Sequence, residues 1–183
     1  MERKMREMSN LHQHSAFSFQ DGVCTPEEII AAAKAKGLRS IALTDHGHCH
    51  GHARFFLEAK KQGVRAILGM EAYVINDFAE WRAMKDKLAL EKKKDSEEIE
   101  FDLDRAALDK ANRKVLYRKG HLVLLAKNRT GLANLYNLQY KAHKFGYYQK
   151  PRLDKRMLAD HSEGIISSSA CMGGIISTKI WAM

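Results

Sequence analysis

Short apolar runs alternate with helical segments along most of this 183-residue chain, and this alternation restricts the fold more than any other feature. Runs suited to strands lie at residues 10–14, 40–44, 66–74, 121–127 and 164–168. Repeated strand–helix units are typical of an α/β fold with parallel strands and right-handed crossovers. The pattern therefore predicts a parallel sheet, open or closed into a barrel, with helices on its surface.

The first predicted helix carries signals at both of its ends. Thr25 and Glu28 have the spacing of a capping box, Pro26 occupies the first helical position, and Gly37 supplies the C-terminal stop. Further helices are expected at about residues 51–62, 130–144 and 153–161.

Residues 79–119 interrupt this pattern. Segments 79–94 and 103–118 are rich in Lys, Glu, Leu and Ala, and the acidic run 95–98 lies between them. We expect two exposed, salt-bridged helices inserted between the third and fourth strands. A solvated excursion is favoured over a partner-binding arm.

Composition limits the class of protein. The chain is 45% hydrophobic, which is typical of globular proteins, and its apolar runs are too short to span a bilayer. Residues 1–8 are charged and lack the apolar core of a signal peptide. Three cysteines, at positions 24, 49 and 171, do not suggest a disulfide framework, so a cytoplasmic location is expected.

The net charge of +9 is concentrated toward the C-terminus. Residues 120–183 carry nine Lys/Arg and three Asp/Glu. A polyanionic partner, nucleic acid first, would suit this segment, and a solvated basic surface is the alternative interpretation.

Side chains with metal-binding chemistry follow the predicted strands. His12 and His14 alternate along a strand and so point to the same side. The candidates at strand ends are His12, His14, Asp21, Asp45, His46, Glu71, His121 and Cys171. Imidazole, carboxylate and thiolate suit zinc, and imidazole with carboxylate also suits manganese. A carboxylate such as Glu71 can bridge two cations that activate water and hold phosphoryl oxygens, so this set predicts phosphoester hydrolysis.

Histidines without a strand-end position are interpreted as surface or supporting groups, namely His48, His50, His52, His143 and His161. Cys24 and Cys49 are interpreted as buried thiols rather than ligands.

The ordered motifs resemble the PHP (polymerase and histidinol phosphatase) family. The first four are Leu11–His14, Asp21–Gly22, Thr44–Gly47 and Gly69–Glu71. Four more resemble the N-terminal PHP domain of bacterial replicative DNA polymerase III alpha subunits, namely His121–Asn128, Gly131–Leu135, Lys150–Arg152 and Ser162–Cys171. The resemblance covers about residues 9–176 apart from the insertion at 79–119.

This resemblance implies a fold and a set of ligands. The fold would be a distorted (βα)7 TIM-like barrel, with residues 1–183 forming a partial PHP domain and residues 79–119 a helical insertion. Up to three Zn²⁺ or Mn²⁺ ions would be held by His12, His14 and Glu71, by Glu71, His121 and Cys171, and by Asp21 and His46. His12, His14, His46 and Glu71 would carry the catalysis, and Asp45 would orient its neighbour.

One family motif, a late Asp-x-His, is absent from the chain. The resemblance then implies that the first and third metals each lack one ligand and that about five of seven strands are present. A fragment, one piece of a split polymerase and a shortened protein remain alternatives. Because an unclosed barrel exposes strand edges, the remaining polymerase polypeptide or a second copy of this chain is expected to cover them.

Three functions remain open. The first is a metal-dependent 3′–5′ exonuclease domain in DNA replication, with DNA as partner, weak activity in isolation and no polymerase activity. The second is a stand-alone phosphatase for a small phosphate ester, and the third is a non-catalytic scaffold of a replication complex. The polymerase-like motifs and the basic C-terminal segment favour the first. Metal content would separate the scaffold from the two enzymes.

Overall fold

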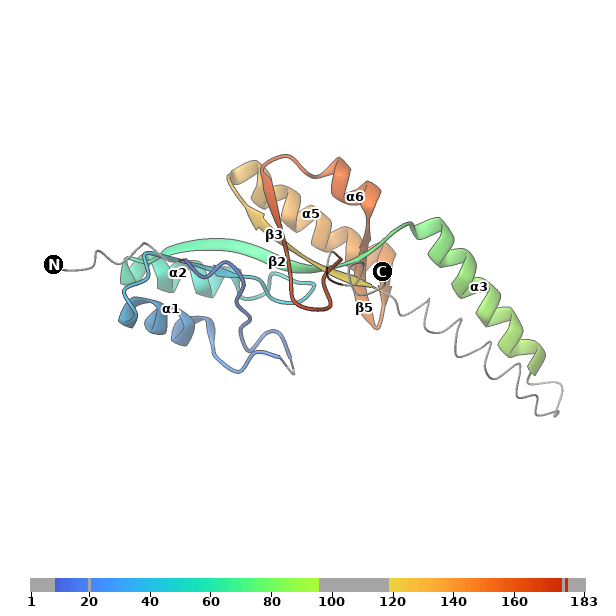
Figure 1. Cartoon of the computed structure of the whole chain (residues 1–183), viewed down its shortest axis with the longest axis horizontal. Helices are drawn as coiled ribbons and strands as arrows, with labels where there is room; N and C mark the ends of the chain where they lie inside the picture. The colour runs from blue at the N-terminus through green and yellow to red at the C-terminus, as the bar shows by residue number, and fades with distance from the viewer. Residues whose placement is uncertain (1–8, 20, 96–118, 176, 178–183) are drawn as a thin grey trace.

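The computed structural model describes residues 9–19, 21–95, 119–175 and 177. In chain order its elements are α1 (Pro26–Ala35), β1 (Ser40–Leu43), α2 (His52–Gln62), β2 (Arg65–Ile75), α3 (Phe78–Asp95), β3 (Gly120–Ala126), α5 (Arg129–Gly146), β4 (Tyr147–Tyr148), β5 (Lys150–Asp154), α6 (Lys155–Asp160) and β6 (Ile165–Ser169). The long strand β2 crosses the centre of the molecule, with α1 and α2 beside its first half and α5 beside its second half (Figure 1). The α/β architecture predicted from the sequence is confirmed.

The sheet is mixed rather than parallel throughout. Its order is β4-β5-β2-β3-β6, and β1 pairs with the first half of β2. Both β1 and β5 run parallel to β2, whereas β3 runs antiparallel to β2 and to β6. Among the described residues β6 pairs with β3 alone, so β6 is an edge strand.

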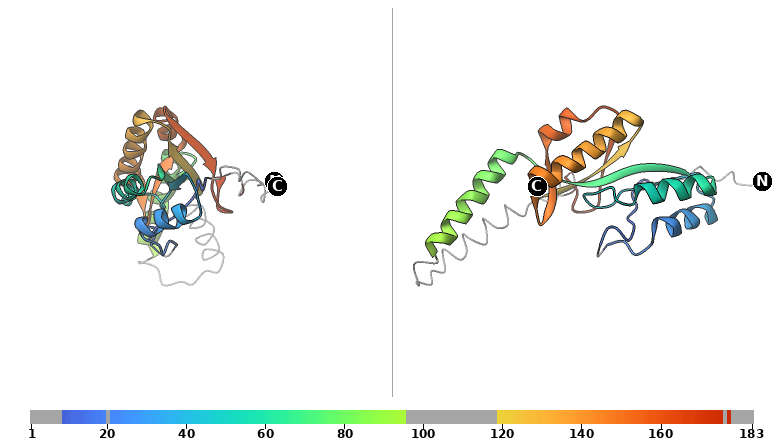
Figure 2. Two further views of the ribbon diagram at one scale, coloured as in Figure 1. Left: turned by 90° about the vertical axis from the view of Figure 1, so that its left-hand side faces the viewer. Right: turned by 180° about the vertical axis from the view of Figure 1, so that it is seen from behind.

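The prediction of an all-parallel sheet is wrong for β3 because of the insertion. The chain leaves β2 at Ile75 and returns at Gly120, which pairs with Val74 at the same end of the strand. The returning strand therefore runs back along β2, as in a long hairpin. Figure 2 shows α3 projecting from this end, away from the rest of the sheet. Helix α3 confirms the first inserted helix, and the second expected helix lies outside the described residues.

The two faces of β2 lie in different surroundings, because successive side chains of a strand point to opposite sides. Met70, Ala72 and Val74 pack into an apolar core that α5 covers. The other members of this core are Cys49, Leu124, Leu135, Leu138, Ala142 and Leu153. Glu71 and Tyr73 alternate with the core residues and therefore point to the opposite face.

A second apolar core joins α1, β1 and α2. Ile30, Leu43 and Phe55 are fully buried in it. The predicted capping box of α1 is confirmed, since Oγ1 of Thr25 accepts from the Glu28 N–H at 3.3 Å and the Glu28 carboxylate accepts from the Thr25 N–H at 2.7 Å. These contacts fix the start of α1, where the loop that ends at residue 24 enters the helix.

Two sequence expectations about elements are wrong. The predicted strand at 10–14 forms only an isolated pairing of Asn10 with Ile41, because the N–H groups of His12 and Gln13 donate to the side chains of Asn10 and Thr44 instead of to carbonyls of β1. The predicted helix at 153–161 begins later, at Lys155, and residues 150–154 form β5. The carboxylate of Asp154 caps the helix by accepting from the Met157 N–H at 2.8 Å, which ends the strand at this residue.

In the described part of the chain, no helix has the length and apolar character needed to cross a membrane.

Candidate metal centre

Glu71 is the central residue of the candidate site. It is fully buried in the middle of β2, and its carboxylate is reached by side chains from four segments. Oε2 lies 2.5 Å from Nε2 of His12 and 3.0 Å from Nε2 of His14. Oε1 lies 2.7 Å from Nδ1 of His121. Each carboxylate oxygen of Glu71 therefore faces a different group of potential ligands.

A second group lies beside the first. Oδ2 of Asp21 is 2.8 Å from Nε2 of His46 and 3.7 Å from Nε2 of His14. Nδ1 of His46 is 3.7 Å from Oε2 of Glu71. Asp21 is half-exposed, so this group opens to solvent.

Cys171 completes the third group. Its Sγ lies 3.4 Å from Nδ1 of His121 and 3.8 Å from Oε1 of Glu71. Of the six other residues that were nominated as ligands, five contact the Glu71 carboxylate and the sixth, Asp21, reaches it through His14 and His46, although the sequence alone could not give these distances.

The segment carrying His12 and His14 reaches the site without forming a strand. It runs beside β1, where the Thr44 N–H donates to the Gln13 carbonyl at 2.8 Å. His14 is followed by Ser15, whose N–H and hydroxyl bind the carboxylate of Asp45. The carboxylate of Asp45 therefore bonds to the loop that follows His14.

His46 is fixed by backbone contacts on both of its sides. The Glu71 N–H donates to the Asp45 carbonyl at 3.1 Å, and the Gly47 N–H donates to the Glu71 carbonyl at 2.9 Å. Gly47 has φ +71°, a left-handed conformation that favours glycine. A Cβ at this position would lie 2.7 Å from Cγ of Pro151 and 3.2 Å from Cε2 of Tyr73.

The antiparallel direction of β3 explains why His121 reaches the site from the start of its strand. Its N–H donates to the Gly173 carbonyl at 3.0 Å, which holds the loop after β6 beside it. Cys171 lies on this loop. The beginning of β3 and the end of β6 therefore meet at the same place, beside the middle of β2.

Burial and hydrogen bonding have opposite effects on the pKa values of the cluster. Burial by itself would raise the pKa of Glu71, but hydrogen bonds from His12, His121 and His14 outweigh it and hold the pKa far below its usual range. Burial lowers the pKa of His14, but its hydrogen bond to Glu71 and the surrounding carboxylates reverse this and raise it. Burial lowers the pKa of His46. Glu71 is therefore an anion surrounded by imidazoles.

These residues fit divalent metal ions. Three groups bring their ligand atoms within 4.8 Å of one another, namely His12, His14 and Glu71, then His14, Asp21 and His46, then His46, Glu71 and His121. Nδ1 of His46 is buried and has no hydrogen-bond partner in the described structure. Nitrogen and oxygen donors around a buried carboxylate suit a divalent metal ion.

Tyr73 is a residue of the site that the sequence reasoning missed. Its ring stacks on His46 with 5.5 Å between centroids and 7° between planes, and it contacts His121 edge-on at 5.1 Å. Burial and the charge of Glu71 raise the pKa of its phenol to about 12. The signal was available, because Tyr73 follows Glu71 by two residues on the same face of the strand.

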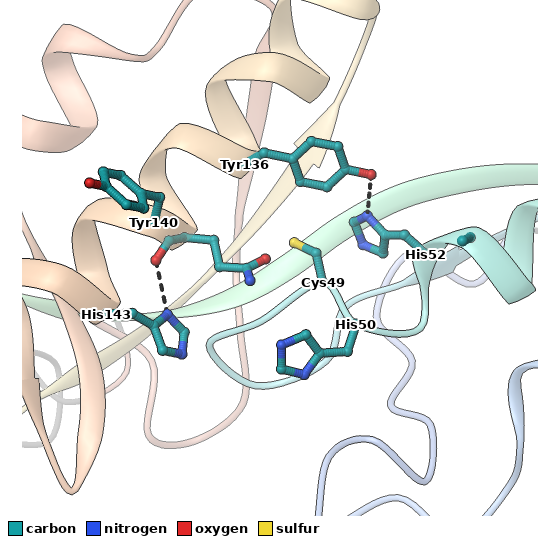
Figure 3. Close-up of a pocket in the computed structure, with 8 residues that line it drawn as sticks. Cys49, His50, His52, Tyr136, Tyr140 and His143 are labelled. Carbon is teal, nitrogen blue, oxygen red and sulfur yellow. Dashed lines mark hydrogen bonds between the residues drawn. The ribbon is translucent and has the colours of Figure 1, made fainter.

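Three other histidines, His50, His52 and His143, line a separate cavity between α2 and α5. The cavity has a volume of about 480 Å³, and Tyr136 of α5 points across it toward His52, whereas the ring of Tyr140 points away from Cys49 and His50 (Figure 3). His143 completes this side, and His48 stacks on His50 with 4.5 Å between ring centroids. Burial raises the pKa of the Cys49 thiol, which keeps it protonated, and no carboxylate lines the cavity. This cavity is therefore a poor metal site despite its imidazoles.

Two interpretations of single residues are corrected. Cys24 is exposed rather than buried, whereas Cys49 is buried as expected. His52 is buried rather than on the surface, and its Nε2–H donates to the Gly69 carbonyl at 2.8 Å. Its Nδ1 accepts from the Tyr136 hydroxyl at 3.3 Å.

Comparison with known proteins points to one family. The family described as PHP domain matches residues 10–182. DNA polymerase III subunit alpha of Borreliella burgdorferi is 37% identical over 173 residues, covering 94% of this chain and 13% of that protein. The same subunit of Aquifex aeolicus is 34% identical over 170 residues, covering 93% of this chain and 13% of that protein. The chain therefore spans about an eighth of the length of these relatives.

A solved amidohydrolase from Chromobacterium violaceum superposes with a TM-score of 0.40 and 21% identity, covering 73% of this chain and 34% of that one.

Proposed function

Because the chain belongs to the PHP domain family, we propose that its histidine and carboxylate cluster binds divalent metal ions and hydrolyses phosphodiesters, as a 3′–5′ exonuclease acting on DNA. One observation carries this proposal: the buried carboxylate of Glu71 presents one oxygen to His12 and His14 and the other to His121. A carboxylate placed in this way can serve two cations at once.

The proposed ligands divide among up to three ions. His12, His14 and Glu71 would hold the first, Glu71, His121 and Cys171 the second, and Asp21 and His46 the third. When bound, such cations polarise phosphoryl oxygens and lower the pKa of coordinated water. The protein's own contribution is to place the ligands, with Asp45 positioning the loop that carries His14 and Tyr73 supporting the ring of His46.

The proposal of DNA as substrate rests on the relatives and on charge. The relatives named above are subunits of a DNA polymerase, and this chain matches about an eighth of their length. Residues 120–183 carry nine Lys/Arg and three Asp/Glu, which suits a polyanion. We propose that the domain acts within a replicative polymerase and that nucleotidyl transfer is performed by other parts of that assembly.

Metal content and strand degradation test the proposal together. The purified chain should retain zinc or manganese after mild dialysis, and Glu71→Gln should lose it. With either metal, a 5′-labelled single-stranded DNA should shorten from its 3′ end, slowly, and His12→Ala should abolish the products. His161→Gln, outside the cluster, is the matched control.

Two results would count against the proposal. Metal content below about a tenth of an equivalent, unchanged on adding zinc or manganese, would indicate a scaffold. Metal-dependent hydrolysis of p-nitrophenyl phosphate without degradation of DNA would indicate a phosphatase for small esters.

A further inference from the structure

Two lysine side chains converge on one aromatic ring at the edge of the candidate metal centre. Nζ of Lys119 lies 5.2 Å from the ring centroid of Tyr73, and Nζ of Lys150 lies 5.8 Å from it. Lys119 immediately precedes β3 and Lys150 begins β5, which are the two strands that flank β2 at Tyr73. The convergence is therefore a consequence of the sheet order rather than of one flexible loop.

The ring that carries the lysines also contacts the proposed ligands. Tyr73 stacks on His46 and touches the edge of His121, with centroid distances of 5.5 and 5.1 Å. The two ammonium groups consequently lie one aromatic ring away from the cluster around Glu71. A molecule bound at the cluster would reach the two lysines only if it extended beyond the cluster.

This corner of the site holds an excess of positive charge. Among the described residues, no carboxylate forms a salt bridge with Lys119 or Lys150. The two ammonium groups instead share one ring, with Nζ atoms 5.2 and 5.8 Å from the centroid of Tyr73. Like charges held together without a carboxylate cost stability, and an anion would relieve their repulsion.

Arg152 differs from the two lysines because its guanidinium binds backbone carbonyls of the protein. It is fully buried, and its guanidinium donates to the carbonyl of Tyr148 and, at 2.9 Å, to that of Lys150. The guanidinium also lies over the rings of Trp81 and Tyr148. Arg152 thus fixes the β4–β5 turn and adds charge, while Lys150 is exposed and Lys119 is half-buried.

We propose that Lys119 and Lys150 form a phosphate-binding subsite, which holds a backbone phosphate of single-stranded nucleic acid next to the phosphate at the metal centre. This inference rests on the proposed function and names its substrate class. A polynucleotide has a neighbouring phosphate to offer, whereas a small phosphate monoester has only the one that reacts. The subsite would therefore favour a strand over a monoester.

Binding without metal tests the subsite independently of catalysis. The affinity of fluorescein-labelled oligothymidylate is measured by anisotropy in EDTA over a series of salt concentrations. The double variant K119Q/K150Q should bind several-fold more weakly, and its dependence of log affinity on log salt should be shallower by about 0.7, the value for one single-strand phosphate contact. K34Q/K36Q, which removes two exposed charges at the end of α1, is the matched control.

A charge-conserving variant guards against a folding defect. K119R/K150R should keep the salt dependence of the unmodified chain, and K119Q/K150Q should have a thermal unfolding midpoint no lower than that of the unmodified chain, because it relieves the repulsion between the two lysines. If K119Q/K150Q and K34Q/K36Q show the same affinity and slope, the subsite is overturned.

A second measurement separates a neighbouring phosphate from the reacting one. With manganese, the p-nitrophenyl ester of thymidine 5′-monophosphate offers one phosphate, and K119Q/K150Q should hydrolyse it as the unmodified chain does. An equal loss on this ester and on the oligonucleotide would assign the lysines to the reacting phosphate and overturn the subsite. If no chain hydrolyses either substrate but the salt slopes still differ, the proposed exonuclease fails and the phosphate subsite stands.

Discussion

Ser15 donates both its backbone N–H and its hydroxyl to the carboxylate of Asp45, with the N–H 2.7 Å from Oδ1 and the hydroxyl 2.9 Å from Oδ2. Both residues are buried. Ser18 adds a third donor at 3.2 Å from Oδ1, and its own hydroxyl oxygen accepts from the His46 N–H at 2.9 Å. Asp45 thereby connects the loop that carries His14 and Asp21 to the backbone of His46.

Replacing Asp45 by asparagine should therefore damage both the fold and the metal centre. The amide keeps the size of the side chain, but it loses the charge and turns an N–H₂ group toward donors. We expect Asp45→Asn to lower the free energy of unfolding by about 2 kcal/mol, as for buried charge-assisted hydrogen bonds, and to weaken metal binding. Urea denaturation of the metal-free chain measures the first effect.

The control for this change is Glu27→Gln. Glu27 pairs with Arg54 at 2.8 Å on the surface, where such pairs contribute at most about 1 kcal/mol. Equal costs for Asp45→Asn and Glu27→Gln would show that the Ser15 contacts do not hold the loop.

Cys171 should discriminate between metals. A thiolate is a soft ligand that favours zinc over manganese, and its Sγ lies 3.8 Å from Oε1 of Glu71 beside His121. Cys171→Ser should thus weaken zinc binding more than manganese binding, as measured by the metal-induced rise in unfolding midpoint. At a metal concentration 100-fold above Kd, the bound metal should raise the free energy of unfolding of the unmodified chain by about 2.7 kcal/mol. Cys24→Ser, which replaces an exposed thiol, should change the binding of neither zinc nor manganese. Equal losses for the two metals would remove Cys171 from the ligand set.

Apolar runs and caps made much of the framework predictable. The apolar runs at 40–44, 66–74, 121–127 and 164–168 all overlap strands, and the first three belong to strands whose central residues are buried. Thr25 and Glu28 located the start of α1 because their spacing is that of a capping box. The motif residues were nominated as ligands on the same local signals, aided by the resemblance.

Long-range geometry was not available from the sequence. The direction of β3 depends on where the chain returns after the insertion, which no local pattern encodes. Residues 10–14 have the composition of a strand but pair at only one isolated position. The contact of Tyr73 with Lys119 and Lys150 joins three strands, so it emerges only from the sheet order.

His52 should make stability depend on pH. Burial lowers its pKa below the ordinary 6.5, and its neutral form donates to the Gly69 carbonyl and accepts from Tyr136. At pH values below 6.5 the unfolded chain binds a proton on this residue that the folded chain resists, so its contribution to stability is lost as pH falls. Above that pH the residue is neutral in both states, so it adds no dependence of stability on pH.

The difference between His52→Gln and the unmodified chain isolates this contribution. His52→Gln should flatten the dependence of unfolding free energy on pH below 6.5. Unfolding by urea at a series of pH values gives both curves. Parallel curves for His52→Gln and the unmodified chain would contradict the assignment.

Gly47 combines a left-handed backbone with a crowded neighbourhood, and a matched glycine separates the two effects. Gly63 has φ +73°, close to the +71° of Gly47, but a Cβ at Gly63 would meet nothing within 4 Å. Gly63→Ala should therefore cost only the backbone strain of an L-residue, about 1 to 2 kcal/mol. Gly47→Ala should cost more, because its Cβ would press on Pro151 at 2.7 Å and on Tyr73 at 3.2 Å. Since Tyr73 stacks on His46, the same change should weaken zinc and manganese binding, while Gly63→Ala leaves both metals unaffected. Urea denaturation and metal titration of the two variants test this, and equal results for both would show that the site tolerates movement of Tyr73.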